Sequence, residues 1–283
     1  MDITPLLLGA VLSALIGGLG YWRKALSLSG VLGAIITGTL IFGLAGIVWG
    51  MVLVAFFVSS SLLSHYRSAH KAHLAEKFEK GQRRDLGQTL ANGGWGALLA
   101  VIVALAGRES QWYPFLALGY FGAVAAVNSD TWATELGVLS AQQPRLITTG
   151  KTVEVGTSGG VTRQGTLSAL AGSGFIAVCT FLFIQGASFL TTGSWLLSDW
   201  FVLPVVTLAG FGGSLLDSVL GATVQRIYIC QECRKETERR QHRDGHTTVP
   251  LRGWPWLNND MVNLLSSVAA SLAAALLAYP FVR

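Results

Sequence analysis

The chain alternates between long apolar runs and short polar connections. A helix that crosses a bilayer needs about 20 mostly apolar residues, within a range of about 17 to 25. Runs of this kind cover residues 4–21, 27–45, 46–63, 88–106, 112–128, 166–190, 201–224 and 261–281. Only the segment from Gly43 to Gly46 can form a turn between the second and third runs. The pattern predicts an all-α fold, a polytopic transmembrane helical bundle of about eight spans, in a single membrane domain over residues 1–283.

The composition is that of a membrane protein. Hydrophobic residues make up 51% of the chain and charged residues 12%, whereas a soluble domain has about 25% charged residues. The 34 glycines suit membrane helices that pack closely through small residues. Three cysteines are too few for a disulfide scaffold. The start of the chain has no basic segment, so the first run is expected to be a retained helix and not a cleaved signal.

The basic residues set the expected orientation. If the chain crosses the membrane at these eight runs, all lysines and arginines except Arg108 and Arg283 fall on one side of the membrane. They lie near residues 23–24, 64–85, 145–163 and 226–252. By the positive-inside rule these connections are cytoplasmic and both termini are non-cytoplasmic. The net charge of +5 therefore requires no nucleic-acid partner, and anionic membrane lipids attract the same face. The connection from Ser64 to Asp85 is expected to be an interfacial amphipathic helix that anchors this topology.

Polar side chains gather at the inner ends of several spans. At 1.5 Å per residue, Asp130 lies roughly 26 Å along a helix that starts near Tyr113, and Asp217 lies roughly 24 Å from Phe201. Asn92 opens the fourth span from the inside, and residues 258–263 open the eighth. A transporter more often places such groups near the midplane. One polar layer at the cytoplasmic boundary instead suits a reaction between a water-soluble reagent and a lipid headgroup.

Three carboxylates are candidate catalytic and Mg²⁺-binding groups: Asp130, Glu135 and Asp217. Asp130 and Glu135 lie in the polar stretch Asn128–Gly137, which could alternatively be a solvated helix end or cap. On a regular helix these two carboxylates point about 140° apart, so they could share one ion only if the chain breaks there. Asp217 lies within a stripe of small residues that lets a neighbouring helix approach closely, and packing does not explain a carboxylate in it.

A glycine-rich loop, Gly156–Thr166, joins the fifth and sixth spans. Its backbone N–H groups, its hydroxyls and Arg163 are suited to phosphate oxygens, and a helix starting near Gln164 would direct its positive end to the same place. The loop lacks the Gly-Lys-Ser/Thr ending of a Walker A motif. A plain connecting loop is the alternative, and the three carboxylates in the same layer favour nucleotide or pyrophosphate binding.

The 226–252 connection carries a candidate zinc-binding insertion. Its pattern is C-x2-C-x8-H-x3-H, formed by Cys230, Cys233, His242 and His246. These ligands suit tetrahedral Zn²⁺ in a structural role, although the x8 spacing is shorter than in a common zinc finger. A redox role for the two cysteines is the alternative.

Four motifs together resemble one known family: Asn128–Gly137, Gly156–Thr162, Gly213–Ala222 and Trp256–Asp260. It is the integral membrane family of plant phytyl-phosphate kinase and animal transmembrane protein 19, also called domain of unknown function 92. The resemblance covers nearly the whole chain. It implies phosphorylation of a prenyl monophosphate to the diphosphate, with CTP or another nucleoside triphosphate as donor. It also implies a cysteine near His242, where this chain has Arg243 followed by His246.

The leading hypothesis is a Mg²⁺-dependent lipid-phosphate kinase of the membrane. Phosphoryl transfer depends mostly on positioning and charge neutralisation, so the protein must hold metal, nucleoside triphosphate and isoprenoid monophosphate together. Besides the three carboxylates, the expected nucleotide- and phosphate-binding residues are Asn128, Ser129, Thr131, Lys151, Thr157, Ser158, Gly159, Gly160, Arg163, Asn259, Asp260 and Asn263.

Four other functions could use the same sequence features. A lipid cytidylyltransferase or a polyprenol kinase would need the same parts at the same interface. A transporter or flippase of a small anion or lipid phosphate would move its substrate without consuming nucleotide. A scaffold without chemistry would need Asp217 for stability alone.

Overall fold

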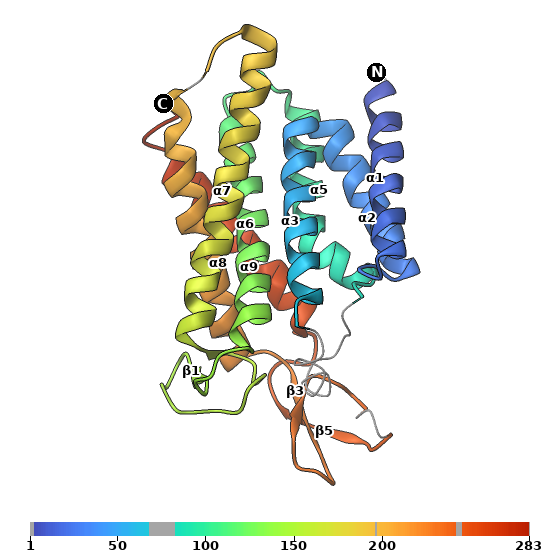
Figure 1. The fold of residues 1–283 in the computed structure, drawn as a ribbon, viewed down its shortest axis with the longest axis vertical. Helices are drawn as coiled ribbons and strands as arrows, with labels where there is room; N and C mark the ends of the chain where they lie inside the picture. Colours follow the sequence, from blue (N-terminus) through green and yellow to red (C-terminus); the bar gives the residue numbers. More distant parts are fainter. Residues whose placement is uncertain (1–2, 68–82, 196, 242–244, 283) are drawn as a thin grey trace.

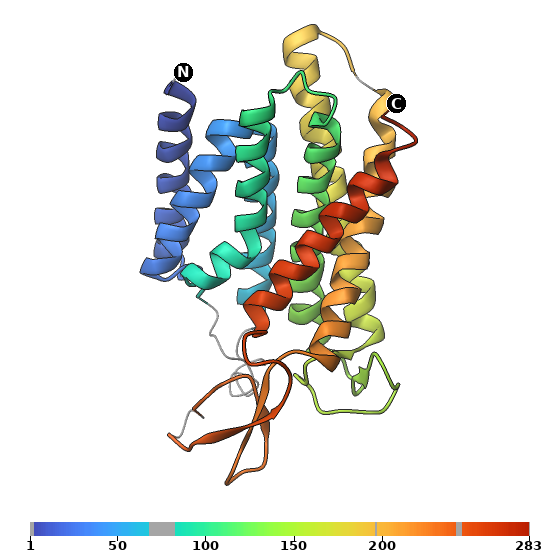
Figure 2. The ribbon, with the colours of Figure 1, turned by 180° about the vertical axis from the view of Figure 1, so that it is seen from behind.

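The computed structural model describes residues 3–67, 83–195, 197–241 and 245–282. The helices are α1 (Thr4–Trp22), α2 (Leu28–Leu40), the π-helical turn η1 (Ile41–Ala45), α3 (Ile47–His65), α5 (Leu86–Ala106), α6 (Tyr113–Gly137), α7 (Arg163–Thr192), the 3-10 turn η3 (Leu197–Phe201), α8 (Val202–Thr223) and α9 (Asn259–Ala278). They form an elongated bundle with short strands at one end (Figures 1 and 2). The predicted all-α membrane bundle is confirmed.

Seven helical segments among the described residues are long and apolar enough to cross a membrane. The other long helix is α6, which the sequence predicted as a span over residues 112–128. Its residues Ala117–Ser129 form an uninterrupted buried run, because neighbouring helices surround it. A helix that faces protein on all sides needs no lipid-compatible surface, so α6 can carry polar residues that lower its mean hydropathy.

Both termini lie at one end of the bundle, and the strands and polar connections lie at the other (Figure 1). The chain passes along the bundle alternately up and down, which brings the connections after α1, α3, α6 and α8 to the same end. Because both termini lie at the same end, the chain crosses the bundle an even number of times, as predicted. Which end faces the cytoplasm stays a prediction from the basic residues.

The uncertain boundary between the second and third spans is a turn at Gly46. Its φ of +99° is in the region that favours glycine, and a Cβ there would lie 2.8 Å from Arg108 Nη2. The π-helical turn η1 directly precedes it. The two spans therefore reverse direction with no polar connection between them.

Small residues bring α6 against α8 and α9. A Cβ added at Gly210 would lie 2.5 Å from Ala125 Cβ, and one at Gly122 would lie 2.6 Å from Ala274 Cβ. Gly210, which belongs to the stripe of small residues predicted around Asp217, thus makes a close contact with α6. On another side, Tyr120 stacks on Trp49 of α3 at 4.3 Å between ring centroids, and its hydroxyl donates to the Trp49 carbonyl at 2.8 Å.

Several helix boundaries differ from the predicted spans by two or more residues, and two of them bear on the site. α6 continues beyond residue 128 to Gly137, since the Asn128 and Ser129 side chains bond to adjacent helices and so do not end the helix. α7 begins at Arg163, before the predicted span of residues 166–190, with Thr162 as its N-cap.

The described residues of the 226–252 connection contain a small sheet. Strands β3 (Ile227–Cys230), β4 (Glu236–Thr237) and β5 (Thr248–Arg252) pair antiparallel in the order β4-β3-β5. A second two-stranded sheet joins β1 (Arg145–Leu146) to β2 (Gly160–Val161). The larger sheet is fixed to the end of α8, because Arg252 Nη1 donates to the Gly221 carbonyl at 2.8 Å. The amphipathic helix predicted between Ser64 and Asp85 falls largely on residues 68–82, outside the described residues.

Candidate functional site

One polar cavity of about 280 Å³ opens at the end of the bundle that carries the sheets. Eight parts of the chain line it: the end of α3, the start of α5, the ends of α6 and α8, the 155–162 loop, the start of α7, the start of α9 and the large sheet. Of the predicted site residues, it brings together Asp130, Thr131, Glu135, Thr157, Ser158, Gly159, Gly160, Asp217, Asn259 and Asn263.

Carboxylates from three separate segments line this cavity. Asp130 of α6 and Asp217 of α8 are close enough to interact electrostatically. Glu238, which follows β4, interacts with both. Glu238 Oε1 also accepts hydrogen bonds from Ser158 Oγ at 3.1 Å and from Gln225 Nε2 at 2.9 Å. The sheet thus brings a third carboxylate to the pair contributed by the helices.

Glu135 belongs to a different part of the cavity. α6 is helical from Tyr113 to Gly137, so the chain break that would let Asp130 and Glu135 share an ion is not present. The Glu135 carboxylate instead accepts a hydrogen bond from Ser64 Oγ at 2.6 Å and attracts the Arg84 guanidinium. A continuous helix directs the two carboxylates about 140° apart, which does not favour one shared ion, and the metal-binding role of Glu135 stays a prediction.

Three helices begin at the cavity. Gln88 in the first turn of α5, Gly165 and Thr166 in the first turns of α7, and Asn259 at the start of α9 all line it. Helix starts carry a partial positive charge, which favours anions. The N-cap residues Asp85, Thr162 and Asn258 each already accept one first-turn N–H group. The cavity therefore combines three positive helix ends with four carboxylates.

The glycine-rich loop lies against the end of α8. Gly159 has a φ of +80°, and a Cβ there would lie 2.5 Å from the Ala222 backbone nitrogen. Only glycine permits both this conformation and this approach. The backbone of Thr157–Gly160 therefore lines the cavity from close range.

The other predicted binding residues do not line the cavity in the described structure. Lys151 and Arg163 are exposed outside it, although Arg163 begins α7. Asp260, in the first turn of α9, is also outside the lining.

Asn128 and Ser129 are fully buried between helices. Asn128 Oδ1 accepts from Ser59 Oγ at 2.9 Å, and its Nδ2 donates to the Gly172 carbonyl at 2.8 Å. Ser129 Oγ donates to the Ala169 carbonyl at 2.7 Å. These bonds join α6 to α3 and α7, so the two side chains hold the helix that carries Asp130 and are not directed at a ligand.

Sequence reasoning missed two charged residues of the site, Arg84 and Glu238. Arg84 is the only lysine or arginine among the described residues that line the cavity. Its position directly before an apolar run was available as a signal, but a basic residue there is also normal for topology. Glu238 lies in an insertion with many charges, and nothing local in the sequence distinguishes it.

Arg84 is held firmly at the edge of the cavity. Its Nη1 and Nη2 donate to Ser61 Oγ at 3.1 Å and Ser60 Oγ at 3.0 Å. Its backbone N–H donates to the Ala25 carbonyl, and its carbonyl accepts from Ser27. Burial lowers the pKa of Arg84, and the Glu135 carboxylate acts in the opposite direction. An anion bound in the cavity would favour the charged guanidinium in the same way as Glu135 does.

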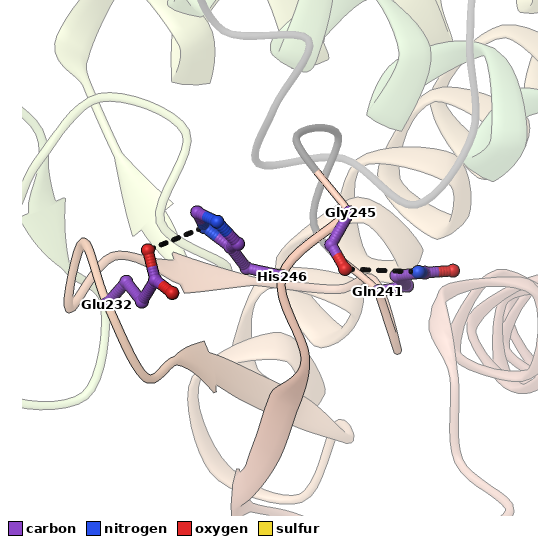
Figure 3. A network of polar contacts seen from close by, with 4 residues as sticks. All are labelled: Glu232, Gln241, Gly245 and His246. Atoms are coloured by element: carbon purple, nitrogen blue, oxygen red, sulfur yellow. Dashed lines mark hydrogen bonds and ion pairs between the residues drawn. The ribbon is translucent and has the colours of Figure 1, made fainter.

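The predicted zinc ligands are only partly described. Cys230 is buried at the end of β3 and Cys233 is exposed in the following turn. His246 faces Glu232, with 3.0 Å between Nδ1 and Oε2 (Figure 3). His242 lies outside the described residues, and within the described part of the chain no three His, Cys, Asp or Glu side chains form a metal-binding group. The zinc site stays a prediction.

Comparison with known proteins places these features in a family. The family model described as "Integral membrane protein DUF92" matches residues 11–271. The chain is 35% identical to Protein PGR of Arabidopsis thaliana, over 98% of each chain. It is 29% identical to an uncharacterized membrane protein of Methanocaldococcus jannaschii, over 90% of this chain and 86% of that one. It is 25% identical to the chloroplastic Protein VTE6 of Arabidopsis thaliana, over 89% of this chain and 65% of that one. No solved structure matches.

Proposed function

Because the chain belongs to the DUF92 family of integral membrane proteins, we propose that it is a membrane-embedded prenyl-phosphate kinase. It transfers a phosphoryl group from CTP or another nucleoside triphosphate to a phytyl- or geranylgeranyl-type monophosphate and forms the diphosphate. The motif resemblance to the family of plant phytyl-phosphate kinase supports the substrate class. The basic connections support placing the active site on the cytoplasmic side.

The observation that carries the proposal is the composition of the cavity. Carboxylates of Asp130, Asp217 and Glu238 stand opposite the first turns of α5, α7 and α9 at the end of an apolar bundle. The carboxylates alone would repel a polyphosphate. The partial positive charges of the helix starts alone would not neutralise the negative charge of a nucleoside triphosphate and a second phosphate together. Both sets of groups are satisfied when phosphates and a divalent cation occupy the cavity together.

Mg²⁺ fits the donor groups that are present. This ion is usually held by one or two carboxylates together with substrate phosphates, and it is seldom enclosed by protein ligands alone. The described residues contain no enclosing group of three ligands, but Asp130 and Asp217 are a pair from separate helices. These two residues would hold the ion, which would supply neutralisation of phosphate charge.

The remaining lining groups would position the donor nucleotide. The Thr157–Gly160 loop and the start of α7 line this part of the cavity, and the positive end of that helix would attract the donor phosphates. The amides of Asn259 and Asn263 on α9 can bind the base or ribose. Glu238 would orient the loop through its hydrogen bond from Ser158.

The reaction itself requires little covalent participation from the protein. An oxygen of the acceptor monophosphate attacks the γ-phosphorus, the bond from that phosphorus to the β-γ bridging oxygen breaks, and the nucleoside diphosphate leaves. The acceptor phosphate is already ionised near neutral pH, with a second pKa of about 6 for a phosphate monoester. No general base is therefore needed, and catalysis is positioning plus charge stabilisation.

The test is a product assay with purified full-length protein, Mg²⁺, geranylgeranyl monophosphate and each nucleoside triphosphate in turn. We expect a prenyl diphosphate and a nucleoside diphosphate in equal amounts. Asp130→Asn should lower the rate by at least about 100-fold. The matched variant Asp199→Asn, in η3 at the opposite end of the molecule, should behave as the wild type. Absence of diphosphate product with every donor, or full activity of Asp130→Asn, would refute the proposal.

The same assay separates the alternative functions. A cytidylyltransferase would release pyrophosphate and attach the nucleotide to the lipid, and a polyprenol kinase would phosphorylate the free alcohol. A transporter would move its substrate across sealed vesicles without nucleotide. The carboxylates line a cavity in the last turns of α6 and α8, and this position favours interfacial chemistry over transport.

A further inference from the structure

A second, mainly apolar crevice lies beside the polar cavity. It has a volume of about 70 Å³ and runs between α1, α2, α3 and α5. Ile16 and Gly17 of α1, Ala34 of α2 and Leu53 and Phe57 of α3 are among its walls. Along α2 and η1 the lining extends from Ala34 to Phe42, roughly 12 Å at 1.5 Å per residue.

The two spaces meet at two side chains. Arg84 and Asn92 line both the polar cavity and the apolar crevice. The Arg84 guanidinium lies over the Phe56 and Phe57 rings, at 5.9 and 6.0 Å from their centroids. A guanidinium has five N–H donors, and only two of its nitrogens make the bonds to Ser60 and Ser61. Donors remain for a phosphate at the junction.

Asn92 supports the same position for an anion. Its Oδ1 is buried and has no hydrogen-bond partner among the described residues. A buried amide oxygen without a partner is unfavourable, and rotation of the amide would present its NH₂ group instead. Asn92 also lies in the second turn of α5, one turn after Gln88, so the positive start of that helix is adjacent.

We propose that Arg84 and Asn92 bind the phosphate of the lipid acceptor, and that the crevice between α1, α2, α3 and α5 holds the adjoining part of its isoprenoid tail. The proposal rests on the proposed kinase function. An amphiphile with one anionic end fits this pair of spaces, because the crevice ends at the one cation of the described cavity lining. The acceptor phosphate is then next to the cavity that holds the donor.

The first experiment locates the tail without requiring transfer. Full-length wild-type protein in lipid nanodiscs is labelled, without nucleotide, by an isoprenoid monophosphate that carries a diazirine on its first isoprene units. Labelled residues are identified by mass spectrometry. We expect labels in α1, α2, α3 and α5 along the crevice. Excess geranylgeranyl monophosphate should remove them, whereas geranylgeraniol, inorganic phosphate and phosphatidic acid should not.

The second experiment tests the headgroup site by kinetics. Arg84→Gln should raise KM for geranylgeranyl monophosphate at least about ten-fold, as expected for the loss of a charge-assisted hydrogen bond, and leave KM for the nucleotide unchanged. Arg83→Gln is the matched control, since Arg83 is adjacent and exposed. Arg84→Lys keeps the charge but not the fork of donors, so its KM should lie between those of the wild type and Arg84→Gln.

A third variant narrows the crevice. Ala34→Phe should raise KM for the acceptor by about ten-fold or more through lost apolar contacts. Ala14→Phe, on the exposed face of α1, should leave it unchanged. If Ala34→Phe fails to fold, the labelling of the wild type still decides the location of the tail.

The outcomes separate the two proposals. Labels confined to other helices, labels removed equally by phosphatidic acid, or no saturable labelling would overturn the acceptor site. Diphosphate product together with labels elsewhere would overturn only the crevice. Crevice labelling without diphosphate product under any condition would overturn the kinase function and leave the binding site standing.

Discussion

The two halves of the bundle use apolar helices in different ways. In the half formed by α6, α7, α8 and α9, glycines meet alanine Cβ atoms, as Gly210 meets Ala125 and Gly122 meets Ala274. In the half formed by α1, α2, α3 and α5, glycines also make close contacts, as Gly38 does with Ser13. Here, however, the helices leave the apolar crevice between them, and α1 exposes Leu15 at 65%. The two groups are visible side by side in Figure 2.

This difference fits what each half would hold in the proposed kinase. Carboxylates that bind an ion must keep their positions against mutual repulsion, and close helix packing supplies that rigidity. A lipid tail has no directional groups, so an apolar space of suitable shape suffices. The polar cavity belongs mainly to the first of these halves, and the crevice belongs to the second.

The largest expected effect is the loss of a carboxylate from the half formed by α6, α7, α8 and α9. Asp217→Asn should reduce phosphoryl transfer by at least about 100-fold, because a charge that positions the metal and phosphates is removed. Thermal unfolding of the variant should differ little from that of the wild type. Unchanged transfer, or a collapse in stability that alone explains the loss, would show that Asp217 is a packing residue.

Next in size is the effect of filling a contact between α6 and α8. Gly210→Val should destabilise the protein by about 1–3 kcal/mol through overpacking against Ala125, as measured by thermal unfolding in detergent. Gly212→Val is the control, because no heavy atom lies within 4 Å of a Cβ at that position on the same helix. Equal stability of the two variants would contradict the close packing assigned to this half.

A smaller effect is expected where the glycine-rich loop touches α8. Gly159→Ala should raise KM for the nucleotide by about ten-fold, since the loop must move away from Ala222 and lose backbone contacts to phosphate. Gly150→Ala is the matched control. Gly150 also has a positive φ, of +68°, but no atom within 4 Å of an added Cβ. A similar KM in both variants would assign the effect to backbone strain and not to the site.

The smallest effect is expected for the carboxylate that the sheet contributes. Glu238→Gln can still accept hydrogen bonds from Ser158 and Gln225 but removes a charge near Asp130 and Asp217. The Mg²⁺ concentration for half-maximal transfer should rise about five-fold, equivalent to about 1 kcal/mol for partly screened charges. Glu109→Gln, exposed at the opposite end, should have no effect. A Glu238→Gln enzyme with normal Mg²⁺ dependence would remove this residue from the site.

The sequence predicted how deep the polar residues lie along the bundle, but not the direction in which their side chains point. Counting residues along the apolar runs placed Asp130 and Asp217 in one layer, and the structure places both in one cavity. The same count placed Asn128, Ser129 and Asp130 together, yet successive residues on a helix face different neighbours. Asn128 and Ser129 are directed at adjacent helices, and Asp130 is directed at the cavity.

Arg84 shows why some site residues escape such reasoning. As a basic residue in a polar connection it is indistinguishable from Arg83, and both follow the positive-inside rule. The side chains differ because Ser60 and Ser61 at the end of α3 hold the guanidinium of Arg84. That contact joins residues more than twenty positions apart, and no local pattern encodes it.

Composition and apolar run length were enough to establish a membrane bundle, its spans and the end at which polar chemistry gathers, because lipid requires apolar residues over a set length whatever the tertiary contacts are. The choice of groups that face each other depended on how helices rotate and pack. Arg84 and Glu238 at the cavity, Glu135 turned away from Asp130, and the crevice beside Asn92 all follow from that packing. Close contacts between distant segments set these rotations, and such contacts leave no periodic signal in the chain.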